Sequence, residues 1–249
     1  MYSREEEFQW DNHLVFNRYT NLDTIEGRIL EGLVMSKSVH AMRLWNMLED
    51  DGLNCLNRPN MNLVNTPNDI EGWKKEYERR RKMIYSGVGE SSEKKVFLSP
   101  FTDDAWTKEG SRLDIFVDDI IPANHLSSTV LVGIELIVHN KIVNIYSDAD
   151  EENQQTNPSE LITLVNEEGE EVVEPLIRVK SRPSTMLKST LAELNGVFVA
   201  GIGQLQLNAK MNIKCGVKRT MWNNRAYIGY SLVFATLMSG VSENPEYGY

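Results

Sequence analysis

Residues 205–217 alternate between apolar and polar side chains, and this pattern constrains the fold more than any other in the chain. The odd positions are apolar from Leu205 to Val217, and the even positions are amides and lysines apart from one glycine. Alternation with period two predicts a β-strand that has one buried face and one solvated face. A turn at 219–225 and a second apolar run follow, so residues 204–238 are predicted to form one long β-hairpin.

The length of this hairpin has a consequence for function. An arm of about fifteen residues at ~3.3 Å per residue is about 50 Å long. A compact chain of 249 residues is itself only about 45–50 Å across. The hairpin must therefore either bend sharply at a glycine or project from the body, and a projecting apolar face has to be buried against another copy or a partner. This favours an assembly subunit over a self-contained enzyme.

The first part of the chain is predicted to be helical. Apolar residues recur at helical spacing in 22–35 and in 38–48. A third helix is expected to start at Thr66, with Pro67 in its first turn, and to run to Ile84. Glutamates interleave with the lysines and arginines of this helix, which predicts a solvated, salt-bridged helix.

The second part of the chain is predicted to be mostly β. A single helix at 182–196 interrupts the apolar runs, and the hairpin follows it. This order predicts an α+β fold: an N-terminal helical region, then a mostly antiparallel β domain with one packed helix and a long C-terminal β-hairpin. We expect the helical region to span residues 1–92, with a Gly- and Ser-rich linker from 87 onward, and the β-rich domain to span 93–249. The strands before the hairpin are expected at 112–117, at 129–145 with a bulge or turn at 139–141, and at 161–165.

Charge is distributed unevenly along the sequence. The formal net charge is −10, and residues 147–174 hold ten carboxylates without a single lysine or arginine. Residues 175–239 instead carry nine basic side chains and one acidic side chain. Such asymmetry is informative about partners. The acidic insertion 147–174 is therefore predicted to offer an acidic partner surface, made of Asp148, Asp150, Glu151, Glu152, Glu167, Glu168, Glu170 and Glu171.

The hairpin carries the opposite charge. No aspartate or glutamate occurs between residues 194 and 239, so the basic side chains there have no acidic neighbour in the sequence. We expect an acidic or polar partner, either another copy of the chain or DNA, to meet this surface. The predicted basic surface consists of Lys210, Lys214, Lys218, Arg219 and Arg225.

Sequence signatures of catalysis are missing. The chain has no phosphate-binding loop, no HExxH and no CxxC. The carboxylates of Asp114, Asp118, Asp119 and Glu135 could assemble a metal site of the nuclease kind. Aspartates at a strand end before a proline are common in turns, however, so a structural role is favoured. We expect no catalytic residue, no bound metal, no cofactor and, because no apolar run is long enough to span a bilayer, a soluble protein without membrane contact.

Three features follow one another in the second part: the strand Ser111–Val117 before Pro122, the apolar run Val130–His139, and the helix and hairpin from Arg182 to Met238. With the acidic insertion, the order is strand, long strand, insertion, helix and long hairpin. This order resembles that of head-to-tail connector and tail-terminator proteins, which form rings in the necks and tails of tailed bacteriophages. The resemblance does not extend to the helical first part.

The resemblance implies a structural role. Proteins of this kind assemble as rings of six or twelve copies below the portal, let DNA pass through the lumen without sequence specificity, and have no enzymatic site. It implies a homo-oligomeric ring in the virion, assembled in the host cytoplasm, with portal, neck or tail proteins as neighbours. It also implies that the hairpin joins a ring interface or lines the lumen, and that the acidic insertion faces a neighbouring ring or copy.

Two other functions stay open at this level. The four carboxylates named above are compatible with a metal-dependent nuclease or a related phosphate enzyme. The basic side chains of the hairpin are compatible with a DNA-binding accessory protein, whose affinity for DNA would fall steeply with salt.

Overall fold

A five-stranded sheet lies at the centre of the structure, which is a computed structural model. The structure describes residues 24–87, 93–100, 108–124, 127–146, 161–165, 171–175, 179–199, 202–207 and 215–239. Most of the predicted linker lies outside these residues. In spatial order the sheet consists of β1 (Val96–Phe97), β2 (Ser111–Asn124), β3 (Ser127–His139), β11 (Tyr227–Ser239) and β10 (Gly216–Trp222).

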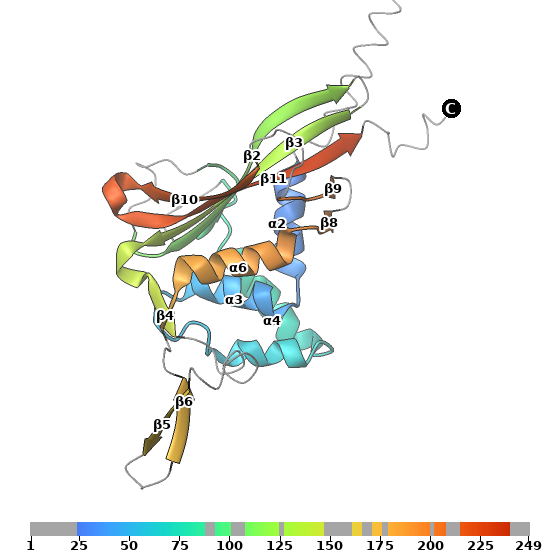
Figure 1. Cartoon of the computed structure of the whole chain (residues 1–249). Coiled ribbons are helices and arrows are strands. Elements are labelled where there is room, and N and C mark those ends of the chain that lie inside the picture. Colours follow the sequence, from blue (N-terminus) through green and yellow to red (C-terminus); the bar gives the residue numbers. More distant parts are fainter. Residues whose placement is uncertain are drawn as a thin grey trace, which may run out of the picture.

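The helices are α2 (Ile25–Met35), α3 (Val39–Glu49), α4 (Ile70–Lys82) and α6 (Arg182–Leu194), with the 3-10 helix η2 (Pro59–Asn65) between α3 and α4. They gather on one side of the sheet (Figure 1). α2 and α3 contact β2, α6 contacts β3 and β11, and α4 packs against α2. The predicted α+β class is confirmed: helices come first, a mostly antiparallel sheet follows, and one helix of the second part packs on it.

β3 and β11 form the middle of the sheet. The two strands are antiparallel and pair through all thirteen residues of β11. β2 pairs antiparallel with the other side of β3, with a bulge at Asp118, and β1 pairs parallel with β2. β11 and β3 approach so closely at Gly229 that a Cβ there would lie 1.7 Å from the carbonyl oxygen of Leu136. Only glycine fits this position without a shift of the backbone.

One apolar core joins the helices to the sheet. Alternate side chains of β2 and β3, such as Ile115 and Ile134, are fully buried and belong to the same cluster as Leu33 of α2, Leu44 of α3 and Met186 of α6. Since a strand alternates its faces, this single apolar face fixes the register of both long strands. The helical part and the β-rich part of the chain therefore share their core.

Three two-stranded sheets account for the other described strands. They are β4 (Asn144–Tyr146) with β7 (Val179–Ser181), β5 (Leu161–Val165) with β6 (Glu171–Pro175), and β8 (Phe198–Val199) with β9 (Gly203–Gln204). The strand predicted at 161–165 is confirmed. The interruption predicted at 139–141 is also found: the 3-10 helix η3 (Asn140–Ile142) divides the run 129–145 into β3 and β4.

The predicted C-terminal hairpin exists as β10 and β11, but its bounds differ from the prediction. β10 extends to Trp222, and the reversal is the short 3-10 helix η5 (Asn223–Arg225), so the predicted turn began too early. Asn223 and Arg225 both have positive φ angles, 46° and 74°. These two residues adopt the left-handed backbone conformation, which makes the tight reversal possible without a glycine.

The first arm of the predicted hairpin is described only at 204–207 and 215–222. Gln206 forms an isolated bridge with Ala235, whereas Gly216 pairs with Val233. The chain thus advances ten residues between two positions that are only two residues apart on β11. The second arm, β11, is a central strand of the sheet rather than a free arm, so the hairpin contributes to the body of the molecule.

α4 begins later than predicted. The sequence predicts Thr66 as the capping residue, but Asp69 caps the helix, with its Oδ1 accepting a hydrogen bond of 2.9 Å from the backbone N–H of Gly72. A carboxylate at this position also interacts favourably with the helix dipole. Thr66 instead lies in the preceding loop, where its carbonyl accepts a hydrogen bond from the indole of Trp73.

α4 is also less solvated than its charged sequence predicts. Glu76 and Arg80 are almost fully buried beside Trp73, because spacings of three and four place all three on one helix face. Arg80 donates to Glu76 and to the carbonyl oxygens of Val34 and Ser36, at 2.8, 2.8 and 2.7 Å. The prediction of a solvated helix is wrong for this face, which closes the C-terminal end of α2.

Arg182 closes the C-terminal end of α3 in the same way. Its guanidinium donates to the carbonyl oxygens of Met47, Asp50 and Gly52 at 2.9, 2.6 and 2.7 Å. The last turns of α2 and α3 contain no basic residue, and the last carbonyls of a helix have no partner within it. Two arginines from later in the chain supply these partners and tie the helices together.

Candidate functional site

Three of the five predicted basic residues are described. Lys218 and Arg219 lie in β10, and Arg225 lies in η5; all three are exposed, and no carboxylate of the described residues forms an ion pair with them. Lys210 and Lys214 lie outside the described residues. Because successive residues of a strand point to opposite faces, Lys218 and Arg219 do not share one face as a single basic surface would require. The positive charge lies on both faces of β10.

β10 is an edge strand. It pairs with β11 through all seven of its residues, and within the described part of the chain it has no neighbour on its other side. Its outer N–H and C=O groups can pair with a further strand. Val217 and Met221 on this strand are 40% and 53% exposed. The alternation predicts Val217 to be buried, which is wrong because α6 packs against β3 and β11 and β10 lies beyond them.

The predicted acidic surface is described at one residue only. Glu171 begins β6, opposite Val165 of β5. The β5–β6 hairpin contains a second carboxylate, Glu174, and no basic residue, and it has no third strand among the residues that the structure describes. Figure 1 shows this hairpin at the end of the molecule away from β10. The other predicted residues, Asp148, Asp150, Glu151, Glu152, Glu167, Glu168 and Glu170, lie outside the described ranges.

The four carboxylates considered for a metal site do not come together. Asp114 and Glu135 are partners on β2 and β3, whereas Asp118 and Asp119 are exposed at the bulge farther along β2. No group of three or more His, Cys, Asp or Glu side chains arranged to hold a metal ion occurs in the described ranges. Of the four carboxylates, the described structure therefore brings only Asp114 and Glu135 together.

Asp114 is nevertheless unusual. It is fully buried, and Arg112 Nε donates to its Oδ1 at 2.6 Å, while Oδ2 has no hydrogen-bond partner among the described residues. Burial raises the pKa of Asp114 to about 7; Arg112 opposes this rise, and the negative charge of Glu135 adds to it. The Arg112 guanidinium also stacks on Phe97, 3.8 Å from the ring centre. This buried cluster changes its protonation near neutral pH.

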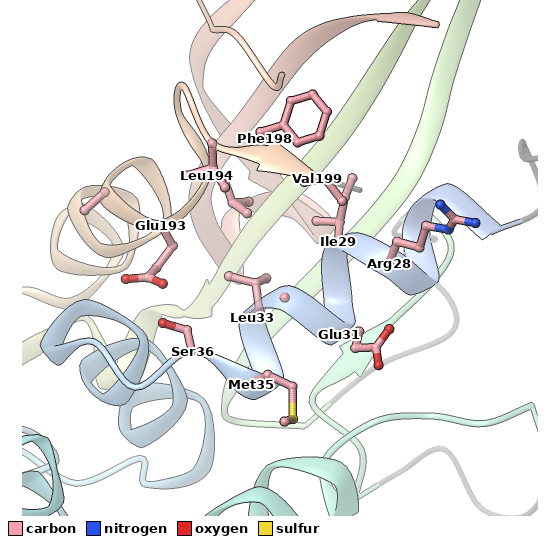
Figure 2. A pocket seen from close by; sticks show the side chains of 13 residues that line it. Arg28, Ile29, Glu31, Leu33, Met35, Ser36, Glu193, Leu194, Phe198 and Val199 are labelled. Atoms are coloured by element: carbon pink, nitrogen blue, oxygen red, sulfur yellow. The ribbon is translucent and has the colours of Figure 1, made fainter. Parts of the chain in front are cut away.

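A groove that the sequence did not predict lies between α2, the end of α6, and β8 (Figure 2). Its volume is about 720 Å³. Ile29, Leu33 and Leu194 form its buried wall, and the carboxylate of Glu193 accepts a hydrogen bond from Ser38 at one side. The sequence signal for this groove was the apolar triplet 197–199 directly after a helix. Such a triplet is also typical of an ordinary buried strand, so it does not by itself predict a groove.

Comparisons with models of protein families, with curated proteins and with solved structures find no match for this chain. None of the helices in the described ranges has both the length and the apolar character needed to cross a membrane.

Proposed function

We propose that this chain is a non-enzymatic structural subunit that binds copies of itself to form a ring in the neck or tail of a tailed bacteriophage. One observation carries the proposal: a basic strand edge and an acidic hairpin, both without a further strand among the described residues, lie apart from each other in the molecule (Figure 1). Edges that do not meet within one chain can meet between two chains.

The β5–β6 hairpin needs such a contact. An isolated two-stranded hairpin is marginally stable at best in water, and a third strand or a packed helix is required for independent stability. β5 and β6 have five residues each and pair only with each other in the described part of the chain. A strand from another copy would complete a three-stranded sheet and bring Glu171 and Glu174 close to positive charge.

β10 offers the complementary edge. Its seven residues are long enough to pair along either strand of that hairpin. Backbone hydrogen bonds supply affinity when a strand is added to a sheet edge, and complementary charge speeds the encounter and fixes the partner. Lys218 and Arg219 provide this charge, and the contact would also remove Val217 and Met221 from water.

A contact between two unlike surfaces is heterologous. Repeated from copy to copy, it closes into a ring when the rotation between copies allows it. A ring of six or twelve copies is what the resemblance to neck and tail proteins implies. The virion location, the portal, neck or tail neighbours and the passage of DNA through the lumen belong to the same proposal, and the exposed Arg225 of η5 is available to face phosphates there.

Native mass spectrometry and negative-stain imaging at low salt test the proposal. We expect one closed ring species at micromolar concentration. Charge reversal at β10 and the adjoining η5 (Lys218→Glu, Arg219→Glu and Arg225→Glu together, the β10 triple variant) should reduce it to monomers. The matched control reverses three exposed cations of α4, Lys74, Arg81 and Lys82, and should leave the rings intact. A wild-type chain that stays monomeric, or rings lost equally in both variants, would contradict the proposal.

The same three cations favour a second candidate, a DNA-binding accessory protein. This function predicts that the logarithm of DNA affinity falls linearly with the logarithm of salt concentration, with a slope of about −0.9 per neutralised phosphate. Titration of duplex DNA into the wild-type chain and the β10 triple variant measures it. Tight, salt-sensitive binding by a chain that forms no ring would favour this candidate over the structural subunit.

A further inference from the structure

Three large apolar side chains are exposed around the groove between α2, α6 and β8. Phe198, Met35 and Val197 are 73%, 53% and 40% exposed, and all three line the same cavity. Figure 2 shows Phe198 and Met35 beside it. Single exposed apolar residues are ordinary, but a group of them around one hollow is typical of a surface that binds another segment.

The α2 wall of the groove leaves room for such a segment. Gly32 lines the cavity, and a Cβ built on it would meet no atom within 4 Å. Ile29 and Leu33 from α2 and Leu194 from α6 form an aliphatic part of the wall, and Arg28, Glu31 and Glu193 also line the cavity. The groove therefore suits an apolar segment that lies flat along α2.

The chain itself contains a suitable segment directly before α2. Residues 1–23 lie outside the described residues and lead into Thr24, the residue before the first turn of α2. Within 8–16, apolar side chains stand at Phe8, Trp10, Leu14 and Phe16, and the positions between them are mostly polar. Alternation with period two gives an extended segment one apolar face.

The distances allow this segment to fold back. The α2 residues that line the groove run from Arg28 to Ser36, about 12 Å at 1.5 Å per residue. A link of seven residues, 17–23, can span up to about 24 Å. Because the segment and the groove belong to one chain, the effective concentration of the segment is on the order of millimolar, which favours its own groove over that of another copy.

We propose that residues 8–16 of the same chain bind in the groove between α2, α6 and β8, in extended form and with their alternating apolar side chains against Leu33, Val197 and Phe198. Binding covers the exposed apolar rim and fixes the N-terminal segment to the surface of α2. This contact does not depend on ring formation, and its test is independent of the oligomeric state.

Hydrogen exchange of the full-length chain, followed by mass spectrometry, is the first experiment. Backbone amides of 8–16 should exchange at least about tenfold more slowly than in an unstructured peptide. Gly32→Trp fills the groove and should abolish this protection. Gly27→Trp is the matched control, because Gly27 is an exposed glycine of the same helix with equally open surroundings and no part in the groove.

Phe198→Asp provides a second groove variant at an exposed position, so a folding defect in one variant does not decide the result. Both groove variants should lose the protection, and the control should keep it. Fast exchange of 8–16 in the wild-type chain, or protection that survives both groove variants, would overturn the proposal.

A photocrosslinking benzophenone amino acid in place of Trp10 identifies the occupied site. We expect crosslinks to the peptide that contains 197–199. In a mixture of ¹⁵N-labelled and unlabelled chains, crosslinks within one chain carry a single isotope label. Crosslinks of mixed label would assign the groove to the segment of another copy, and crosslinks to other surfaces would remove it from the groove; either result rejects the proposal.

Discussion

Burial changes what individual charged residues do in this protein. Arg80 appears in the sequence as one of several cations on a polar helix, yet it is fully buried and binds carbonyl oxygens 44 and 46 residues earlier in the chain. Charged residues are rarely buried unless they are paired. The spacing of Trp73, Glu76 and Arg80 was a usable signal, but the partners of Arg80 are set by tertiary structure and could not be predicted.

Arg182 gives the clearest prediction at this scale. Arg182→Met keeps most of the side-chain volume but leaves the carbonyls of Met47, Asp50 and Gly52 without a donor. We expect the free energy of unfolding to fall by about 3 kcal/mol or more, measured by urea denaturation. Arg81→Met, at an exposed arginine of α4, should change it by less than about 0.5 kcal/mol. Similar losses in both variants would contradict the role of Arg182.

Asp114 predicts how stability depends on pH. Its pKa is about 7 in the folded protein against an ordinary value of 3.8. Between these two values the folded state holds a proton that the unfolded state releases. The contribution of protonated Asp114 to the free energy of unfolding is therefore fully present below about pH 4 and is lost as pH rises from about 4 to 7. A shift of about three units corresponds to at most about 4 kcal/mol.

Asp114→Asn removes the titrating group, so the variant should show a flatter dependence of unfolding free energy on pH between 4 and 7. Urea titrations at several pH values measure this slope, and the comparison is made between slopes because the variant also loses the ion pair with Arg112. A variant with the slope of the wild-type chain would show that another group titrates there.

At the scale of elements, local patterns predicted which segments form but not where they end. The apolar spacing of α2, α3 and α6 and the alternation of β2 and β3 were sufficient, because each pattern faces one core. The alternation at 205–217 did not predict how the described ends of this segment pair with β11. A period-two pattern cannot reveal that Gln206 and Gly216 meet positions only two residues apart on β11.

Two glycines provide opposite predictions for the same substitution. Gly229→Ala forces a Cβ into the backbone of β3, so we expect a loss of about 1–3 kcal/mol or more in unfolding free energy. Gly27→Ala lies in an exposed, open position of α2 and should add up to about 1 kcal/mol through helix propensity. Thermal unfolding of both variants checks the pair, and a neutral Gly229→Ala would refute the close approach of β11 and β3.

At the scale of the whole molecule, the sequence predicted the separation of charge but not the surfaces that carry it. The edge position of β10 depends on which strands meet, and that is decided by long-range pairing. The groove could not be predicted because its walls come from distant parts of the chain; Ser38 and Glu193, which meet at its side, are 155 residues apart. Only the tertiary fold brings them together.

Complementary variants test whether copies join through unlike surfaces. The β10 triple variant described above carries an acidic edge, and Glu171→Lys with Glu174→Lys makes the hairpin basic. Each variant alone should be monomeric, since like charges then face each other at every contact. Mixed in equal amounts, they should form oligomers with equal numbers of both, because opposite charges again meet. Native mass spectrometry of the mixture reads the composition directly, and a mixture that remains monomeric would argue against pairing of β10 with β5–β6.

In the proposed ring, the separation of β10 from the β5–β6 hairpin would also determine how growth stops. Each copy would have two different binding surfaces, β10 and the β5–β6 hairpin. An incomplete ring would therefore always have one unoccupied surface of each kind, to which a further copy can bind. When the ring closes, the last two unoccupied surfaces would bind each other. The finished ring would then have no free binding surface, and growth would stop. The stoichiometry is then set by the angle between the two surfaces, not by the strength of the contact.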